Sequence, residues 1–142
     1  MTQTIDEVLQ QLKLYTDDTD YKLLRLHPRA VTLAAGIAAE VADPFVLCMA
    51  DKDEVTLVIA AERVADFADR LRDHVISDAN YRLITLDVAL SPSLVGFMAK
   101  ISAVLASAGI SLLALSAFSR DHLLIPSDQF DRAWQALEAL KR

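Results

Sequence analysis

The amino-acid sequence predicts an α+β fold made of two small units, each an antiparallel sheet that carries its helices on one face. Three observations predict this fold. Several short runs are apolar or alternate between apolar and polar residues, as strands do. Between them lie segments whose apolar residues are three and four positions apart, as on one face of a helix. The order strand, helix, strand, strand, helix occurs twice in the 142 residues.

Composition agrees with a packed core and excludes two classes of partner. Apolar residues make up 54% of the chain and charged residues 24%, an apolar excess that favours a covered sheet or an interface with a partner. The net charge of −6 gives no attraction to phosphate backbones, so we expect no nucleic-acid binding. The longest weakly polar run, Ala30–Met49, contains Glu40, Asp43 and Pro44, so we expect no membrane span.

The N-terminus and the single cysteine favour a cytoplasmic protein. The segment Met1–Asp6 has neither the basic region nor the apolar region of a secretory signal. Cys48 lies in the apolar run Pro44–Met49, has no intrachain partner and is typical of a buried strand residue. A reducing compartment is therefore expected.

The elements of the first unit follow from capping, periodicity and breaking residues. Thr4 with Glu7 predicts a capping box at the start of a helix. A strand should end at Pro28, and the acidic stretch Thr16–Asp20 lacks the glycine and glutamate of a calcium loop, so it predicts a solvated turn. The expected elements are a helix Ile5–Leu14, a strand Tyr21–His27, a helix Ala30–Ala42, strands Phe45–Ala50 and Val55–Ala60, and a helix Glu62–His74.

The second unit has stronger local signals. Ser91 can cap a helix whose first residue is Pro92, and Gly109 stands where such a helix should end. Ser127 is expected to cap the last helix. The expected elements are a strand Tyr81–Leu90, a helix from Pro92 to about Ala108, strands Ile110–Phe118 and His122–Pro126, and a helix that buries Phe130, Ala133, Trp134, Leu137 and Leu140.

The polar connector Ser77–Asn80 is the expected boundary, which gives units over residues 1–78 and 79–142. Each unit is one strand short of a complete ferredoxin-like βαββαβ arrangement. The missing strands are expected to come from the other half of the chain or from another chain.

The run Ser93–Gly96 followed by Leu105–Ser111 resembles the helix–turn–strand signature of ACT domains. The run Ala114–Phe118 followed by Asp121–Pro126 resembles the strand–turn–strand of small stand-alone tandem ACT proteins, and Asp53–Val58 resembles the acidic turn and strand of their first half.

This resemblance covers roughly Tyr21–Leu140 and implies two ferredoxin-like ACT-type units. ACT domains are regulatory modules, often amino-acid binding, on aspartokinases and other metabolic enzymes. The resemblance therefore implies a regulatory module that binds a small molecule such as an amino acid at the junction of its units. The family usually has a basic residue where this chain has Met49-Ala50-Asp51, and often an acid where it has Ser91-Pro92, in the region of the ligand.

The resemblance places candidate ligand contacts at the start of a helix and on the facing strands and turn. Ser91 and Ser93 would lie at a helix N-terminus, where backbone N–H groups favour an anion, although Ser91 could simply cap the helix. His122 could instead be an ordinary packing residue. The candidate contacts are Ser91, Ser93, Leu94, Val95 and Gly96, together with Ser116, Arg120, Asp121 and His122.

Gly96 is expected one turn inside the helix, where glycine costs roughly 0.5–1 kcal/mol relative to alanine. A bound metabolite or a facing strand that approaches the backbone closely would explain it. On that interpretation, Gly96→Ala should leave the fold intact and raise the helix propensity slightly.

The sequence carries no recognised catalytic or cofactor signature. It has three glycines and none of the glycine-rich phosphate loops, serine elbows or paired metal-binding histidines of common enzymes. His27, His74 and His122 are not spaced as metal ligands. We therefore expect no metal, no cofactor and no enzymatic activity.

The high apolar content and the open sheet edges predict a homodimer. Two alternatives stay open at this point. One is a dimerisation or interaction module that binds no ligand, which the missing basic residue near Ala50 favours. The other is a small enzyme on a ferredoxin-like scaffold.

Overall fold

The computed structural model describes residues 3–141 and divides the chain into two compact units. The first unit is Asp18–Tyr81. The second unit combines the chain up to Asp17 with the chain from Arg82 onward. The segment up to Asp17, which was expected in the first unit, thus groups with the second.

The first unit is an antiparallel sheet with a helix. Its sheet has the order β3-β4-β2, and a short strand β5 also pairs with β2. β2 and β4 pair along their whole length, from Tyr21 opposite Ala60 to Leu26 opposite Val55. The elements are β2 (Tyr21–Leu26), α2 (Val31–Val41), β3 (Leu47–Ala50), β4 (Val55–Ala60), the 3₁₀ helix η1 (Ala61–Phe67) and β5 (Val75–Ile76).

The core of the first unit lies between α2 and the sheet. Ala34, Ile37 and Val41 are buried on one face of the helix, at the spacing that the sequence predicted. They pack with alternate residues of β2 and β4, because side chains two apart in a strand point to the same face. The buried cluster consists of Leu24, Leu26, Ala34, Ile37, Val41, Val55, Leu57, Ile59, Phe67 and Leu71.

The predicted helix Glu62–His74 is wrong. Only Ala61–Phe67 is helical, as a 3₁₀ helix, and the chain then turns to form β5. Phe67 and Leu71 are each 4% exposed, so their helical spacing reflected burial in the core. Asp73 has a φ of 51°, which no regular helix has, and the extended chain beyond it pairs with Leu24 and Arg25. Tertiary pairing overrides local helix propensity here.

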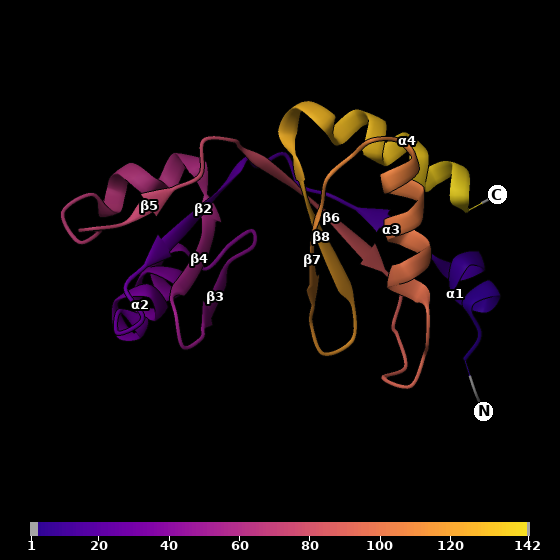
Figure 1. The fold of residues 1–142 in the computed structure, drawn as a ribbon, viewed down its shortest axis with the longest axis horizontal. Coiled ribbons are helices and arrows are strands. Elements are labelled where there is room, and N and C mark those ends of the chain that lie inside the picture. Colours follow the sequence, from indigo (N-terminus) through magenta and orange to yellow (C-terminus); the bar gives the residue numbers. More distant parts are fainter. Residues whose placement is uncertain (1–2, 142) are drawn as a thin grey trace. The chain divides into compact units, whose positions relative to one another are not determined.

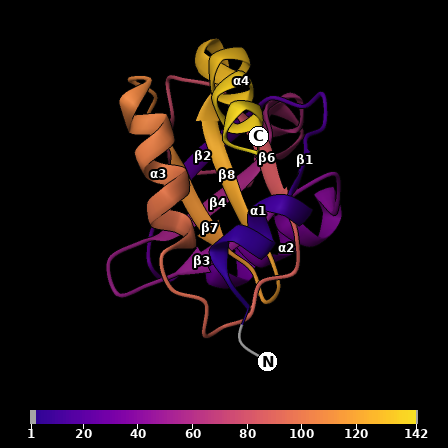
Figure 2. The ribbon, with the colours of Figure 1, turned by 90° about the vertical axis from the view of Figure 1, so that its right-hand side faces the viewer.

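The second unit has the ferredoxin-like order of elements. Its sheet has the order β1-β6-β8-β7, with β1 antiparallel to β6. Helices α3 and α4 lie on the same side of this sheet (Figures 1 and 2). The elements are α1 (Ile5–Gln11), β1 (Lys13–Tyr15), β6 (Tyr81–Asp87), α3 (Phe97–Ser107), β7 (Leu113–Ser116), β8 (Asp121–Pro126), the 3₁₀ turn η2 (Ser127–Gln129) and α4 (Phe130–Leu140).

The missing strand of the second unit comes from the N-terminal segment. The capping box of Thr4 and Glu7 is present, as predicted, but α1 ends at Gln11. Lys13 and Leu14, predicted as helical, belong to β1 and pair with β6. With β1 in place, the order β6-α3-β7-β8-α4-β1 in space completes the βαββαβ arrangement within this chain.

The core of the second unit includes residues of α1 as well as of α3 and α4. Val8 is fully buried and Leu12 is 2% exposed, so the N-terminal segment is part of the packing. The buried cluster consists of Val8, Leu12, Ile84, Leu86, Val88, Phe97, Ile101, Leu105, Ile110, Leu123, Ile125, Phe130, Ala133 and Leu137.

The boundaries of the second unit differ from the predicted ones at several places. β6 ends at Asp87, whereas the sequence predicted a strand as far as Leu90. β7 is limited to Leu113–Ser116, whereas the sequence predicted a strand over Ile110–Phe118. Ser127 begins a 3₁₀ turn, and the N-cap position of α4 is Gln129. The start of α3 also differs and is described with the candidate site. None of the helices within residues 3–141 has the length and apolar character that a membrane span requires.

Candidate functional site

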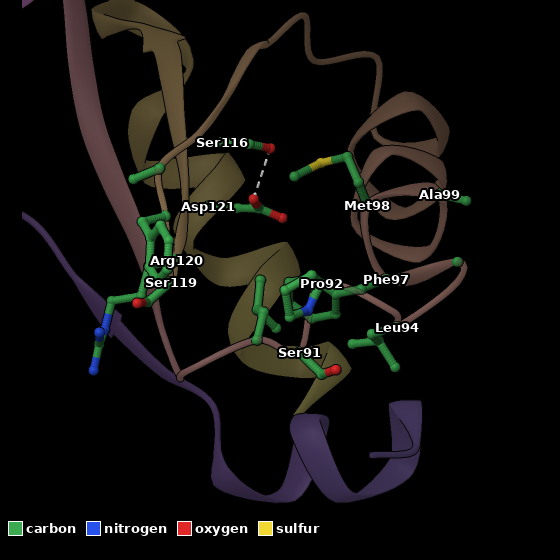
Figure 3. A pocket seen from close by; sticks show the side chains of 14 residues that line it. Ser91, Pro92, Leu94, Phe97, Met98, Ala99, Ser116, Ser119, Arg120 and Asp121 are labelled. Atoms are coloured by element: carbon green, nitrogen blue, oxygen red, sulfur yellow. Dashed lines mark hydrogen bonds between the residues drawn. The ribbon is translucent and has the colours of Figure 1, made fainter. Parts of the chain in front are cut away.

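A pocket of about 470 Å³ lies within the second unit. Its walls are the connection between β6 and α3, the first turn of α3, and the β7–β8 hairpin (Figure 3). The lining residues are Leu90, Ser91, Pro92, Leu94, Gly96, Phe97, Met98, Ala99, Ser116, Ala117, Phe118, Ser119, Arg120 and Asp121.

Ser91 caps a turn in the connection and does not cap α3. The Ser91 carbonyl oxygen accepts a hydrogen bond from Leu94 N–H at 3.0 Å, which closes a turn. The Ser91 hydroxyl accepts from Ser93 N–H at 3.3 Å and lies 2.8 Å from the Ser93 hydroxyl. α3 begins at Phe97, so the predicted helix start at Pro92 is wrong. A serine–proline pair suits the start of a turn as well as the start of a helix.

Gly96 is the N-cap residue of α3 and not an interior helical residue. Its φ is 91°, a left-handed conformation that strongly favours glycine. A Cβ atom at this position would lie 3.3 Å from Ile5 Cδ1, closer than an ordinary contact. Backbone conformation and the contact with Ile5 therefore explain the glycine. The interpretation of Gly96 as a residue inside the helix is wrong, and so is the expected gain in helix propensity on Gly96→Ala.

The N-terminus of α3 presents backbone donors at the pocket wall. The N–H groups of Phe97, Met98 and Ala99 have no partner within the helix, because the first turn lacks preceding carbonyl groups. Gly96 has no side chain that could cap them, and the first intrahelical bond runs from Lys100 N–H to Gly96 O. The positive end of the helix dipole adds to these donors, so this wall favours an anionic group.

The hairpin contributes a carboxylate to the same pocket. Ser116 and Asp121 are paired across β7 and β8, and the Ser116 hydroxyl donates to Asp121 Oδ1 at 2.9 Å. In Figure 3 both side chains lie in the pocket, on the side facing Met98 of α3. A bond from Ala117 N–H to Arg120 O at 2.9 Å closes the hairpin. The carboxylate of Asp121 favours a cationic group in the pocket.

The charge of Arg120 is directed away from the pocket. Arg120 Nε donates to Asp87 Oδ1 at 2.7 Å, and both side chains are almost half exposed. The guanidinium group points away from Asp121 in Figure 3. Arg120 therefore lines the pocket, while its charge is paired on the sheet.

Three of the predicted contacts do not line the pocket. Ser93 and Val95 lie in the connection, and Val95 is 84% exposed. His122 follows Asp121 in β8, so it points to the opposite face of the strand, where its Nδ1 lies 2.8 Å from Thr85 Oγ1. Burial lowers the pKa of His122, with an opposing effect from Asp121 and a smaller lowering effect from Arg120. Among residues 3–141, no group of three or more His, Cys, Asp or Glu residues could hold a metal ion.

Several residues of the pocket were not predicted from the sequence. Met98 and Ala99 were assigned to the middle of a helix that in fact begins beside them. Phe118 was assigned to a strand, but it lies in the hairpin connection and is 97% exposed. The position of Phe118 next to the expected turn at Ser119–Asp121 could have indicated that it lies in the hairpin connection.

A second, smaller pocket of about 300 Å³ lies in the first unit. Its lining is acidic and includes Asp18, Asp20, Glu62 and Asn80. The three carboxylate side chains are exposed, as expected for a solvated turn.

Comparison with known proteins places the fold among characterised ones. A family model described as an ACT domain matches residues 76–139. No curated protein matches the chain in sequence. Several solved structures share its fold. They confirm the predicted α+β class with two ferredoxin-like units.

Three solved structures illustrate the similarity. Protein VC0802 from Vibrio cholerae, a protein of unknown function described as a possible transport protein, is 24% identical, with a TM-score of 0.77 over 98% of this chain and 97% of that chain. Protein Atu0741 from Agobacterium tumefaciens is 20% identical, with a TM-score of 0.72 over 92% and 89%. The regulatory subunit of aspartate kinase from Thermus flavus is 12% identical, with a TM-score of 0.70 over 91% and 97%.

Proposed function

Because a family model described as an ACT domain matches residues 76–139, we propose that the chain is a non-catalytic regulatory module whose second unit binds a small zwitterionic metabolite, such as an amino acid. The observation that carries this proposal is the pairing of opposite electrostatic preferences across one pocket. The uncapped N-terminus of α3 lies on one wall and the carboxylate of Asp121 lies on another.

The two walls suit the two charged groups of an amino acid. An α-carboxylate at the start of α3 would accept bonds from the N–H groups of the first turn. An α-ammonium group would be a charge-assisted donor to Asp121, whose second partner is the Ser116 hydroxyl. The side chain of the ligand would then meet apolar residues of the lining, such as Leu94 and Met98.

A thermal-shift screen with the common L-amino acids tests this proposal. Each amino acid that raises the melting temperature is compared with its N-acetyl form, which lacks the ammonium group, and with its amide, which lacks the carboxylate. Both derivatives should lose the effect. Asp121→Asn should weaken binding at least about tenfold, because it removes a charge-assisted interaction.

The matched control is Asp69→Asn, a change at an exposed aspartate of the first unit that should leave binding unchanged. No shift with any amino acid, or equal shifts with the amide and N-acetyl forms, would refute the zwitterion proposal. The first of these results would favour the ligand-free interaction module.

We also propose that the chain forms a homodimer through β7. This strand lies at one end of the sheet of the second unit, and Leu113 on it is 38% exposed. An open strand edge can pair with the same edge of a second copy. Light scattering coupled to size exclusion should give about twice 15.6 kDa, and a monomer would contradict the proposal. The cytoplasmic location expected from the sequence stays a prediction.

A further inference from the structure

We propose that Gln3 is a positioning residue of the pocket in the second unit. Its side chain holds the loop Ala89–Ser91, which forms part of the pocket wall, in the conformation that receives the ligand. This inference rests on the proposed binding function and assigns to the N-terminal segment a role in that binding.

The side-chain amide of Gln3 bridges two backbone groups of the loop. Gln3 Nε2 donates to the Ala89 carbonyl oxygen at 2.9 Å, and Gln3 Oε1 accepts from Ser91 N–H at 2.7 Å. The residue between them is held from the other side, because Leu90 N–H donates to Ser119 O of the hairpin at 2.8 Å. Leu90, Ser91 and Ser119 all line the pocket. The loop is therefore fixed between the N-terminal segment and the hairpin.

The pair of contacts requires a side chain that both donates and accepts. A carboxamide presents an N–H donor and a carbonyl acceptor in one plane, as a neighbouring strand would. A glutamate could accept from Ser91 N–H, but its second oxygen would face the Ala89 carbonyl oxygen. A methionine has nearly the same length and makes neither bond. These two substitutions therefore separate the contacts from side-chain size.

Packing of α1 fixes the position of Gln3. Thr4 follows it directly and caps α1 together with Glu7. Val8 of α1 is buried in the same cluster as Phe97 at the start of α3. Ile5 lies beside Gly96, the residue before α3, since a Cβ atom on Gly96 would be 3.3 Å from Ile5 Cδ1. The segment that carries Gln3 thus contacts both ends of the connection between β6 and α3.

A positioning role and a purely structural role predict different results. If Gln3 only adds stability, its loss should lower the free energy of unfolding and affect all amides of the second unit together. If it positions the loop, its loss should free the loop amides more than the other amides of the second unit and should weaken binding. Because coupling is reciprocal, a ligand in the pocket should also protect the contact between Gln3 and the loop.

Hydrogen exchange of the ligand-free, full-length chain provides the first test. In Gln3→Met, the Ser91 amide should exchange about tenfold faster, while the Leu105 amide within α3 stays unchanged. Gln10→Met is the matched control, because Gln10 is an exposed residue of α1. Unchanged exchange at Ser91, or an equal increase at Leu105, would overturn the proposal.

Affinity for the amino acids of the thermal-shift panel provides the second test. Gln3→Met and Gln3→Glu should each weaken binding about fivefold, measured against each variant's own melting temperature in the absence of amino acids. Wild-type affinity in both variants would overturn the proposal. If the wild-type chain binds none of the amino acids, the proposed function falls, and the exchange at Ser91 still decides whether Gln3 holds the loop.

Discussion

The two units differ in the connection that follows their first strand. In the first unit, β2 leads to α2 through the short turn His27–Ala30. His27 Nδ1 accepts from Arg29 N–H at 3.1 Å, and His27 O accepts from Ala30 N–H at 2.9 Å. In the second unit, β6 leads to α3 through Val88–Gly96, which is more than twice as long and forms the wall of the larger pocket.

This difference shows how one arrangement of strands and helices gains or lacks a binding site. Neither helix has a side-chain cap, because the N-cap residues of α2 and α3 are Ala30 and Gly96. The helix N-terminus is therefore common to both units, and what distinguishes the second is the long connection that leaves space in front of it. In the first unit, the short turn His27–Ala30 stands in place of the long connection. None of its residues lines either of the two pockets.

The largest expected effect concerns the long connection. Gly96→Ala should lower the free energy of unfolding by about 1–3 kcal/mol, because alanine must adopt a left-handed φ and contact Ile5. Chemical denaturation measures this change. The additional change Ile5→Ala should recover only the part that is due to the contact. A Gly96→Ala protein as stable as the wild type would contradict the left-handed conformation.

A glycine of the first unit should respond with the opposite sign. Gly36 lies in the interior of α2, and a Cβ atom there would have nothing within 4 Å. Gly36→Ala should raise the free energy of unfolding by about 0.5–1 kcal/mol, because alanine has the higher helix propensity. Denaturation under the same conditions gives the comparison. A loss of stability would mean that α2 packs more tightly than described.

Substitutions of the turn-forming side chains in the two connections should have different effects on stability and on binding. His27→Ala should cost about 0.5–1 kcal/mol of stability and leave amino-acid binding unchanged, because it removes only a turn contact. Ser91→Ala should change the unfolding free energy less and reduce ligand-induced stabilisation, since its hydroxyl orders the pocket loop. Thermal shifts with and without amino acids test both. Equal effects of the two variants on binding would contradict the assignment.

The smallest expected effect is a pH dependence of the second unit. Burial lowers the pKa of His122 below its ordinary value of 6.5, so the folded chain binds this proton less readily than the unfolded chain. Stability should therefore be complete above about pH 6.5 and fall as the pH decreases toward the lowered folded pKa. His122→Gln should flatten this decrease in a series of denaturation curves. An unchanged slope would show that His122 does not contribute to it.

The parts of the fold that the sequence predicted well have local causes. Thr4 and Glu7 form their capping box without help from distant residues. Gly109 ends α3 in a left-handed conformation, with Gly109 N–H bonded to Ala106 O and Ile110 N–H bonded to Leu105 O, both at 3.0 Å. Short-range hydrogen bonds of this kind can be inferred from residue type and spacing.

The errors arise where distant residues decide the backbone. β1 and β5 are strands only because β6 and β2 lie beside them. Ser91-Pro92 satisfied the rules for a helix start, yet the chain forms a turn there that is held by Gln3 and Ser119. Neither partner is close to the loop in sequence. The resemblance to ACT domains predicted the fold class, but it did not predict the turn of the backbone at Ser91-Pro92.

The sequence predicted only part of the candidate site, again because distant residues decide the backbone conformation. The pocket brings together Ser91, Leu94, Gly96, Ser116, Arg120 and Asp121. It leaves out Ser93, Val95 and His122, because alternation along β8 separates neighbours such as Asp121 and His122 and the turn at Ser91 directs the others elsewhere. Side-chain direction depends on where a strand or turn begins, and the sequence alone did not determine those points.

The division of the second unit between the two ends of the chain has a consequence for synthesis. β1 is synthesised before all of the first unit, whereas its partner β6 begins only at Tyr81. The first unit is continuous and can close its contacts as soon as it emerges. The sheet and core of the second unit need residues from before and after the first unit, so we expect α1 and β1 to pair only after β6 has been made. The loop that Gln3 holds therefore depends on contacts between residues 86 and 88 positions apart in the chain.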